Sequence, residues 1–164
     1  MLVVADTTPP LYLARLGLLE LLRELYGTVI VPTAVWHELT VARPDAPGAS
    51  EVRAASWIVV DPGADTSPLL VELQDEIDRG EAAAIALALL READLLLVDD
   101  GAGRRVAAQR GLLPRGTVGV LVAARQRGLI PALRPVLDAL VAEEFRIDAE
   151  LVRRVLLLVD EASD

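Results

Sequence analysis

The chain alternates short, continuous apolar runs with longer segments whose apolar residues recur at helical spacing. The runs lie at residues 2–5, 28–32, 57–61 and 94–100, and Val, Ile and Leu make up most of them. Each run predicts a strand, with 57–61 at an edge of the sheet. Strands that are apolar throughout are typical of a parallel sheet covered by helices on both faces.

The segments between these runs predict helices, because their apolar residues gather on one face at a period near 3.6 residues. A short helix near residue 50 is also predicted. The longer predicted helices are residues 11–26, 33–41, 69–78, 81–93, 103–111, 118–128, 130–145 and 148–162. The sequence therefore predicts an α/β fold with three layers and a central, mainly parallel sheet of about four to five strands. We expect one domain over residues 1–164, with 148–162 as its C-terminal helix.

Composition excludes several kinds of chemistry. The 164 residues are 53% apolar, enough for a sizeable core, and they include no Cys and one His, His37. A disulfide framework, a thiolate zinc site and a site with several His ligands are thereby excluded within one chain. Every basic residue is Arg, which also removes any mechanism that uses a Lys.

The charge of the chain argues against passive binding to nucleic acid. The net charge is −9 and aromatic residues make up 3%, so neither a basic surface nor a stacking platform is expected. An acidic protein can still act on a polyanion if metal ions lie between its carboxylates and the phosphates. No apolar run reaches the length of about 18 residues that a membrane helix needs, and no basic leader precedes the first run. We therefore expect a cytoplasmic protein that does not enter a membrane.

Carboxylates follow the predicted strands. Asp6 ends the first strand, and Asp99 and Asp100 end the strand at 94–100. Glu38 lies in the helix after the second strand, and Glu81 in the first turn of an Ala-rich helix. Because ligands bind beyond the carboxyl ends of parallel strands, these acids could share one site. Gathered carboxylates repel one another, and a hard cation such as Mg²⁺ or Mn²⁺ relieves that repulsion.

Each acid also has a simpler interpretation when taken alone. Asp6 could cap the first helix, and Glu81 suits a helix N-terminus through its charge. Glu38 could be an ordinary solvated helix residue, and Asp99 and Asp100 could form a strand-to-helix turn. These interpretations need four independent causes, whereas a shared metal site needs one.

Five segments, in order along the chain, carry a resemblance to a known family. They are "VVADTTPPLYLARLGLLELL", "VIVPTAVWHEL", "GEAAAIALAL", "ADLLLVDDGAGRRVA" and "GTVGVLVAARQRGLIP". Together they resemble PIN-domain proteins, in the branch close to the VapC-like toxins of toxin–antitoxin pairs. The likeness extends to about residue 147, and the ordered set, rather than any single motif, is specific.

The resemblance implies a metal-dependent ribonuclease fold with an acidic active site. It implies that Asp6, Glu38, Glu81 and Asp99 are the catalytic acids. The implied ligands of Mg²⁺ or Mn²⁺ are Asp6, Glu81 and Asp99, with Asp100 as a substitute for or companion of Asp99. A water activated by the metal would hydrolyse the RNA phosphodiester and leave a 3′-hydroxyl and a 5′-phosphate.

Substrate contacts and partners are also implied. Thr7 and Thr117 match hydroxyl residues of the family pattern. Arg104, the Arg nearest to the acids in sequence, is a candidate for phosphate positioning; the alternative is that the Arg residues after Asp100 pair with surface acids. The resemblance implies an RNA substrate, a cognate antitoxin and a homodimer. The apolar stripe of the predicted helix 148–162 could contact the dimer partner or the antitoxin, and the alternative is that it packs on the core.

Two other functions are weighed against this one. A PIN-like fold could serve as a catalytically silent binding or scaffold module, although no acid of the set is missing. A metal-dependent phosphatase is less favoured, because Thr8 stands where a second Asp would be needed and the chain has no Lys.

Overall fold

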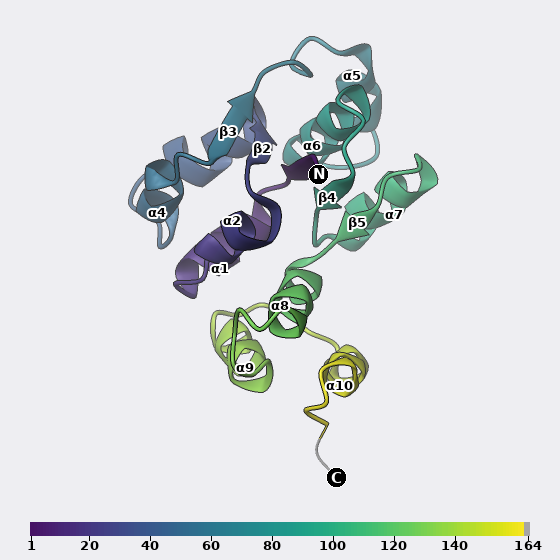
Figure 1. Ribbon diagram of the computed structural model, residues 1–164. Coiled ribbons are helices and arrows are strands. Elements are labelled where there is room, and N and C mark those ends of the chain that lie inside the picture. The colour runs from purple at the N-terminus through teal and green to yellow at the C-terminus, as the bar shows by residue number, and fades with distance from the viewer. Residues whose placement is uncertain (163–164) are drawn as a thin grey trace. The chain divides into compact units, whose positions relative to one another are not determined.

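The computed structural model describes residues 1–162. The chain forms two compact units, Met1–Thr117 and a second one that starts at Val118 (Figure 1). No helix in the described part of the chain is both long and apolar enough to cross a membrane.

The first unit is built on a five-stranded sheet in which all strands run parallel. This confirms the predicted α/β fold with four to five mainly parallel strands, and the strand near 57–61 does lie at an edge. The last strand is not predicted by the sequence, because it is only two residues long and contains a Pro. In spatial order the strands are β3 (Ile58–Asp61), β2 (Val29–Pro32), β1 (Val3–Ala5), β4 (Leu95–Leu97) and β5 (Pro114–Arg115).

The strand order reverses between β1 and β4. The chain moves from β1 outward to β2 and β3, and then returns to place β4 on the other side of β1. Val3 pairs with Leu95 and Ala5 with Leu97, so the carboxyl ends of β1 and β4 lie side by side. In open parallel sheets this kind of switch point is where ligands bind. The acids that follow β1 and β4 are therefore brought to the edge where a site is expected.

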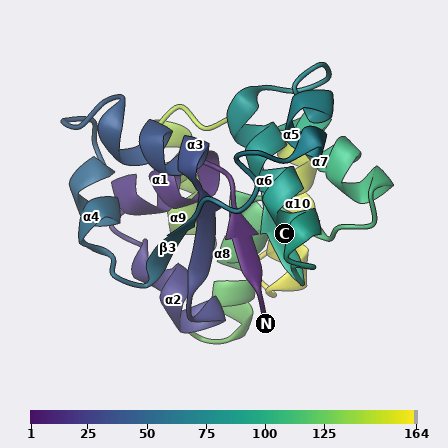
Figure 2. The same ribbon diagram turned by 90° about the horizontal axis from the view of Figure 1, so that it is seen from above.

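Seven α-helices and one π-helix of the described residues lie within the first unit. The longest, α6, packs on the sheet against β1, β2 and β4 (Figure 2). All of its residues from Gly80 to Ala88 are buried, and the run of Ala allows close approach to the strands. The elements are α1 (Thr8–Arg15), α2 (Glu20–Tyr26), α3 (Thr33–Trp36), the π-helix η1 (His37–Val41), α4 (Ala49–Ala54), α5 (Pro68–Leu73), α6 (Arg79–Leu90) and α7 (Gly101–Gln109).

Two predicted helices are each divided in the structure. The segment 11–26 forms α1 and α2, because Gly17 adopts a φ of 72° that ends the first helix. The segment 33–41 forms α3 followed by η1. Helix α1 also begins earlier than predicted, at Thr8, which places Pro9 and Pro10 in its first turn. Pro is tolerated there because backbone N–H groups of the first turn have no partner within the helix.

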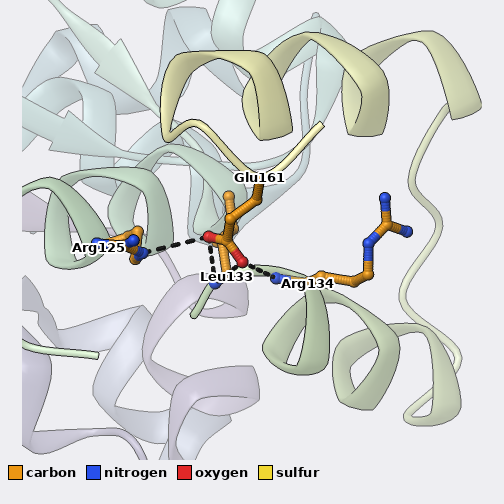
Figure 3. A network of polar contacts seen from close by, with 4 residues as sticks. All are labelled: Arg125, Leu133, Arg134 and Glu161. Carbon is orange, nitrogen blue, oxygen red and sulfur yellow. Dashed lines mark hydrogen bonds and ion pairs between the residues drawn. The ribbon is translucent and has the colours of Figure 1, made fainter. Parts of the chain in front are cut away.

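The second unit contains α9 (Arg134–Ala142), α10 (Ala149–Leu158) and nearly all of α8 (Thr117–Gln126). The N-terminus of α9 has no side-chain cap of its own. Instead, the Glu161 carboxylate accepts hydrogen bonds from the backbone N–H of Leu133 at 2.8 Å and of Arg134 at 3.3 Å (Figure 3). Arg125 Nε lies 3.2 Å from the same carboxylate. Glu161 thus caps α9 from a position beyond α10 in the sequence.

Candidate active site

Asp6 lies at the switch point between the two central strands. Its backbone N–H donates to the carbonyl of Leu97 at 2.8 Å, so the residue extends the pairing of β1 with β4. Its side chain is buried, with the residue 6% exposed. Thr7, not Asp6, occupies the N-cap position of α1. The alternative that Asp6 caps this helix is therefore not what the structure shows.

The carboxyl group of Asp6 is poorly suited to carry a charge without a counterion. Burial, and then the charges of Asp78, Glu38 and Asp99, raise the pKa of Asp6 to about 7, against the opposing backbone hydrogen bond of Thr7. Burial raises the pKa of a carboxyl because the charged form loses its hydration. A nearby cation would remove this cost.

Glu81 is in the first turn of α6, as predicted, and is 7% exposed. Burial is the largest cause of its raised pKa, about 8, and the charges of Asp78, Asp100 and Asp6 add to it. Gly103 of α7 lies against this carboxyl: a Cβ at Gly103 would be 3.5 Å from Glu81 Oε2. The small residue leaves room for Glu81 between α6 and α7.

Asp78 is a further acid whose charge acts on Asp6 and Glu81, although it was not among the candidates predicted from the sequence. Its Oδ1 accepts a hydrogen bond from the backbone N–H of Glu81 at 2.9 Å, which caps α6. Its charge raises the pKa of both Asp6 and Glu81. The signal that could have found it is the sequence "DRGE" at residues 78–81, in which an N-cap acid is followed three residues later by Glu.

Asp99 is half-buried beyond the end of β4. Its Oδ1 accepts from the Thr117 N–H at 2.8 Å, and its Oδ2 from the Thr117 hydroxyl at 2.6 Å. Burial raises the pKa of Asp99, while the bonds from Thr117 and the charge of Arg104 act in the opposite direction. A Cβ at Gly116 would lie 2.7 Å from Asp99 Oδ1 and 2.8 Å from Arg104 Nη1. Arg104 and Asp99 therefore both lie close to Gly116.

Asp100 plays a different structural part from its neighbour. It is exposed, and its Oδ2 accepts from the backbone N–H of Ala102 at 3.0 Å and of Gly103 at 3.2 Å. These bonds cap α7. The turn interpretation thus holds for Asp100, whereas the half-buried Asp99 is held by Thr117 on a different element.

Glu38 is exposed on the π-helix η1, where the bond from Ala42 N–H to the His37 carbonyl, 2.9 Å, spans five residues. The Thr7 hydroxyl donates to Glu38 Oε2 at 2.6 Å, so Thr7 holds this acid instead of capping α1 with its side chain. A Cβ at Gly80 would lie 2.6 Å from Glu38 Oε1. Glu38 is thereby placed against the start of α6.

The donor atoms of this site suit a hard divalent cation, but their present arrangement does not form a ligand set. Carboxylate oxygens are the donors that Mg²⁺ and Mn²⁺ prefer, and burial, together with the charges of neighbouring acids, raises the pKa values of Asp6 and Glu81. Among residues 1–162, no three Asp, Glu or His side chains are grouped so that they could hold one ion. Hydrogen bonds to Thr7 and Thr117 occupy oxygens of Glu38 and Asp99.

The Arg residues after Asp100 divide between two roles. Arg110 pairs with Glu72 at 3.0 Å, Arg125 pairs with Glu161, and Arg115 donates to the Tyr26 hydroxyl at 3.0 Å. These contacts match the alternative of ordinary pairing with neighbouring groups. Arg104 is the one that lies beside a candidate catalytic acid.

Comparison with known families identifies the fold. A family model described as a PIN domain matches residues 2–161, and the chain belongs to this family. The PIN domain is a nuclease-type fold. No similar curated protein and no similar solved structure was found.

Proposed function

We propose that this protein is a Mg²⁺- or Mn²⁺-dependent endoribonuclease that hydrolyses RNA phosphodiester bonds. We further propose that it is the toxin of a type II toxin–antitoxin pair, acting in the cytoplasm as a homodimer. The observation that carries the proposal is the charge interaction of Asp6 with Glu81 and with Asp99 at the switch point of a PIN-domain sheet. The toxin role rests on the resemblance of the sequence alone.

Asp6, Glu81 and Asp99 would hold the cation, with Asp100 as a further ligand if it leaves the N-terminus of α7. A bound divalent cation supplies a Lewis acid that polarises a phosphoryl oxygen and stabilises the leaving oxygen. Because Asp6 and Glu81 have pKa values of about 7 and about 8, both must lose protons near neutral pH before they can act as ligands.

The other polar side chains of the site would orient the acids and the substrate. Thr7 holds Glu38 and Thr117 holds Asp99 through their hydroxyl groups. Glu38 is exposed beside the cluster and can accept a proton from the attacking water. Arg104, beside Asp99, offers guanidinium donors to a phosphate.

RNA cleavage by the purified protein tests the activity directly. We expect cleavage with Mn²⁺, no cleavage in excess EDTA, and a loss of at least about 100-fold in Asp6→Asn, the scale on which removal of a key electrostatic group acts. Asp75→Asn is the matched control, because Asp75 is exposed and lies outside the acid cluster. Equal cleavage by Asp6→Asn and the wild type would contradict the proposal.

A catalytically silent PIN module is the second candidate. The observation that favours it is the absence, within residues 1–162, of three acids grouped to hold an ion. Such a module would bind RNA or protein without cleaving and would not be stabilised by Mn²⁺. Millimolar Mn²⁺ that leaves the melting temperature unchanged, together with uncleaved RNA, would favour this candidate over the nuclease.

The antitoxin and the homodimer are tested separately from the chemistry. Sedimentation of the purified protein at micromolar concentration would give the mass of two chains if the homodimer forms. Co-expression with the protein encoded beside its gene should suppress cleavage if that protein is the antitoxin. A monomer, or undiminished cleavage, would remove that part of the proposal and leave the nuclease activity to stand.

A further inference from the structure

A cavity of about 410 Å³ adjoins the candidate active site in the first unit. This volume falls within the range of about 300–1,000 Å³ that is typical of small-molecule sites. Glu38, one of the candidate catalytic acids, lines the cavity. The cavity lies near the carboxyl ends of β2 and β3, because two of its lining residues are Thr33, which directly follows β2, and Asp65, in the turn after β3.

One part of the lining is apolar. Ala34 of α3, Leu70 of α5 and Ala83 of α6 contribute it. Leu70 and Ala83 also belong to the hydrophobic core beside the sheet, and Ala34 packs against that core. This wall is therefore backed by packed structure and can receive the flat, apolar face of a planar group.

A carboxylate and a cation face the same cavity. Thr33 Oγ1 donates to Asp65 Oδ2 at 2.8 Å, which fixes the carboxylate, while Asp65 Oδ1 has no hydrogen-bond partner in the described part of the chain. Arg79, the first residue of α6, is exposed on the lining and makes no ion pair within residues 1–162. The cavity thus offers a carboxylate acceptor at Asp65 and a cation at Arg79 to an incoming group.

His37 precedes Glu38 on the π-helix η1. In the structure His37 is exposed and lines the same cavity as Glu38. Its imidazole is planar, and planar side chains are common partners for unstacked bases in single-stranded RNA.

We infer that this cavity binds a nucleotide adjacent to the cleaved bond of the RNA and favours a base that carries an exocyclic amino group. The base would lie against the apolar wall, with its amino group donating to Asp65 Oδ1 and a neighbouring phosphate contacting Arg79. A carboxylate can only accept hydrogen bonds, so the C4 amino group of cytosine fits and the C4 carbonyl of uracil is repelled. This inference rests on the proposed function for the identity of the polymer, but not for the binding chemistry.

Binding of two pyrimidine mononucleotides tests the inference without any cleavage. CMP and UMP have the same ribose phosphate and differ in the base at C4 and N3. Each nucleotide is titrated into the wild-type protein in EDTA, and backbone NMR shifts report binding. The Kd of CMP should be about tenfold lower than the Kd of UMP, because one hydrogen bond to a charged group has an effect of this size. The largest shifts should fall at Thr33, Asp65 and Leu70. Equal affinities, no binding at millimolar concentration, or shifts that spare these residues would overturn the inference.

Two variants separate the roles of the charged groups. Asp65→Ala should abolish the preference for CMP over UMP. Arg79→Ala should weaken the binding of CMP and of UMP by the same factor. Both residues are exposed, so these changes leave the core intact. Asp75→Ala and Arg43→Ala are the matched controls, since both are exposed and lie outside the cavity lining, and neither should change binding. A preference for CMP that survives Asp65→Ala would overturn the role of Asp65.

Cleavage of RNA distinguishes failure of this inference from failure of the proposed function. A pair of RNAs that differ by C or U beside the cut should differ about tenfold in kcat/KM with Mn²⁺, and Asp65→Ala should remove the difference. Cleavage that ignores this base overturns the inference and leaves the nuclease intact. Preference for CMP without cleavage of any RNA overturns the nuclease and leaves a nucleotide-binding cavity.

Discussion

Glu81 in the first unit and Glu161 in the second are the same side chain in opposite circumstances. Burial and the charges of neighbouring acids raise the pKa of Glu81 to about 8. Burial also acts to raise the pKa of Glu161, but backbone N–H groups of Leu133 and Arg134 and the guanidinium of Arg125 outweigh it and lower that pKa. At Glu161 the hydrogen-bond donors outweigh burial, whereas at Glu81 burial is the largest cause of the raised pKa and neighbouring acids add to it.

The two regions use carboxylates for different purposes. Glu161 is surrounded by donors that satisfy its charge, and the result is a capped α9 (Figure 3). Around Glu81 the nearest groups include further acids, so the charged form lacks compensation. An arrangement that costs stability in this way is typical of functional sites rather than structural ones.

Addition of a divalent cation should cause the largest change in stability, and it should act on the region of Glu81 and not on that of Glu161. At about 100 times its Kd, Mn²⁺ should raise the free energy of unfolding by about 2.7 kcal/mol and the melting temperature by about 5–10 °C. Asp6→Asn should lose the shift, because it removes a proposed ligand, whereas Glu161→Gln should keep it. Thermal unfolding with and without Mn²⁺ measures both. A full shift in Asp6→Asn would show that the ion binds elsewhere.

Removal of one charge from each region should change stability in opposite directions. Because the folded-state pKa of Glu81, about 8, lies above its ordinary value of 4.5, the folded protein binds the proton more tightly and stability falls as the pH rises between these values. Glu81→Gln should therefore stabilise by about 1–3 kcal/mol at pH 8.5 and by nothing at pH 4.

Glu161→Gln is the counterpart in the second unit. The lowered pKa of Glu161 stabilises the fold above the ordinary value, and this contribution is lost as the pH falls through the folded-state pKa. The variant should lower the melting temperature by about 2–4 °C at pH 7, with a smaller effect at pH 3. Urea or thermal unfolding across pH 4–9 measures the two variants together. The same sign for both at pH 8.5 would contradict the comparison.

Substitution of a glycine beside Asp99 should sharpen the comparison, with the smallest expected change in stability. Gly116→Ala would place a Cβ 2.7 Å from Asp99 Oδ1 and 2.8 Å from Arg104 Nη1, so one of these side chains must shift. We expect a loss of about 0.5–1 kcal/mol in the free energy of unfolding, because both atoms lie at the ends of side chains that can shift, together with weaker binding of Mn²⁺. Gly101→Ala is the control, since a Cβ there meets nothing within 4 Å. Equal stability and Mn²⁺ affinity in both variants would mean that the placement of Asp99 is not constrained by Gly116.

The local pattern of apolar and polar residues predicted much of the fold and the position of two candidate acids. The apolar runs predicted four of the five strands, and the positions of Asp6 and Asp99 beyond two of them followed directly. The pattern did not predict the division of residues 33–41 into α3 and η1, since both kinds of turn bury the same apolar residues. It also missed Asp78, whose capping role was legible in "DRGE" but whose charge matters only through its folded neighbours.

By itself the sequence determined the parallel α/β fold, the family and the acids at the strand ends, because hydrophobic periodicity and the succession of strands and helices are properties of neighbours along the chain. Only the tertiary structure decided which oxygens are free. Asp100 caps α7 while Asp99 is held by Thr117, and Glu38 is held by Thr7, 31 residues away. It also placed Asp65 and Arg79 on one cavity. Such contacts join distant segments, and the packing of the helices on the sheet selects them.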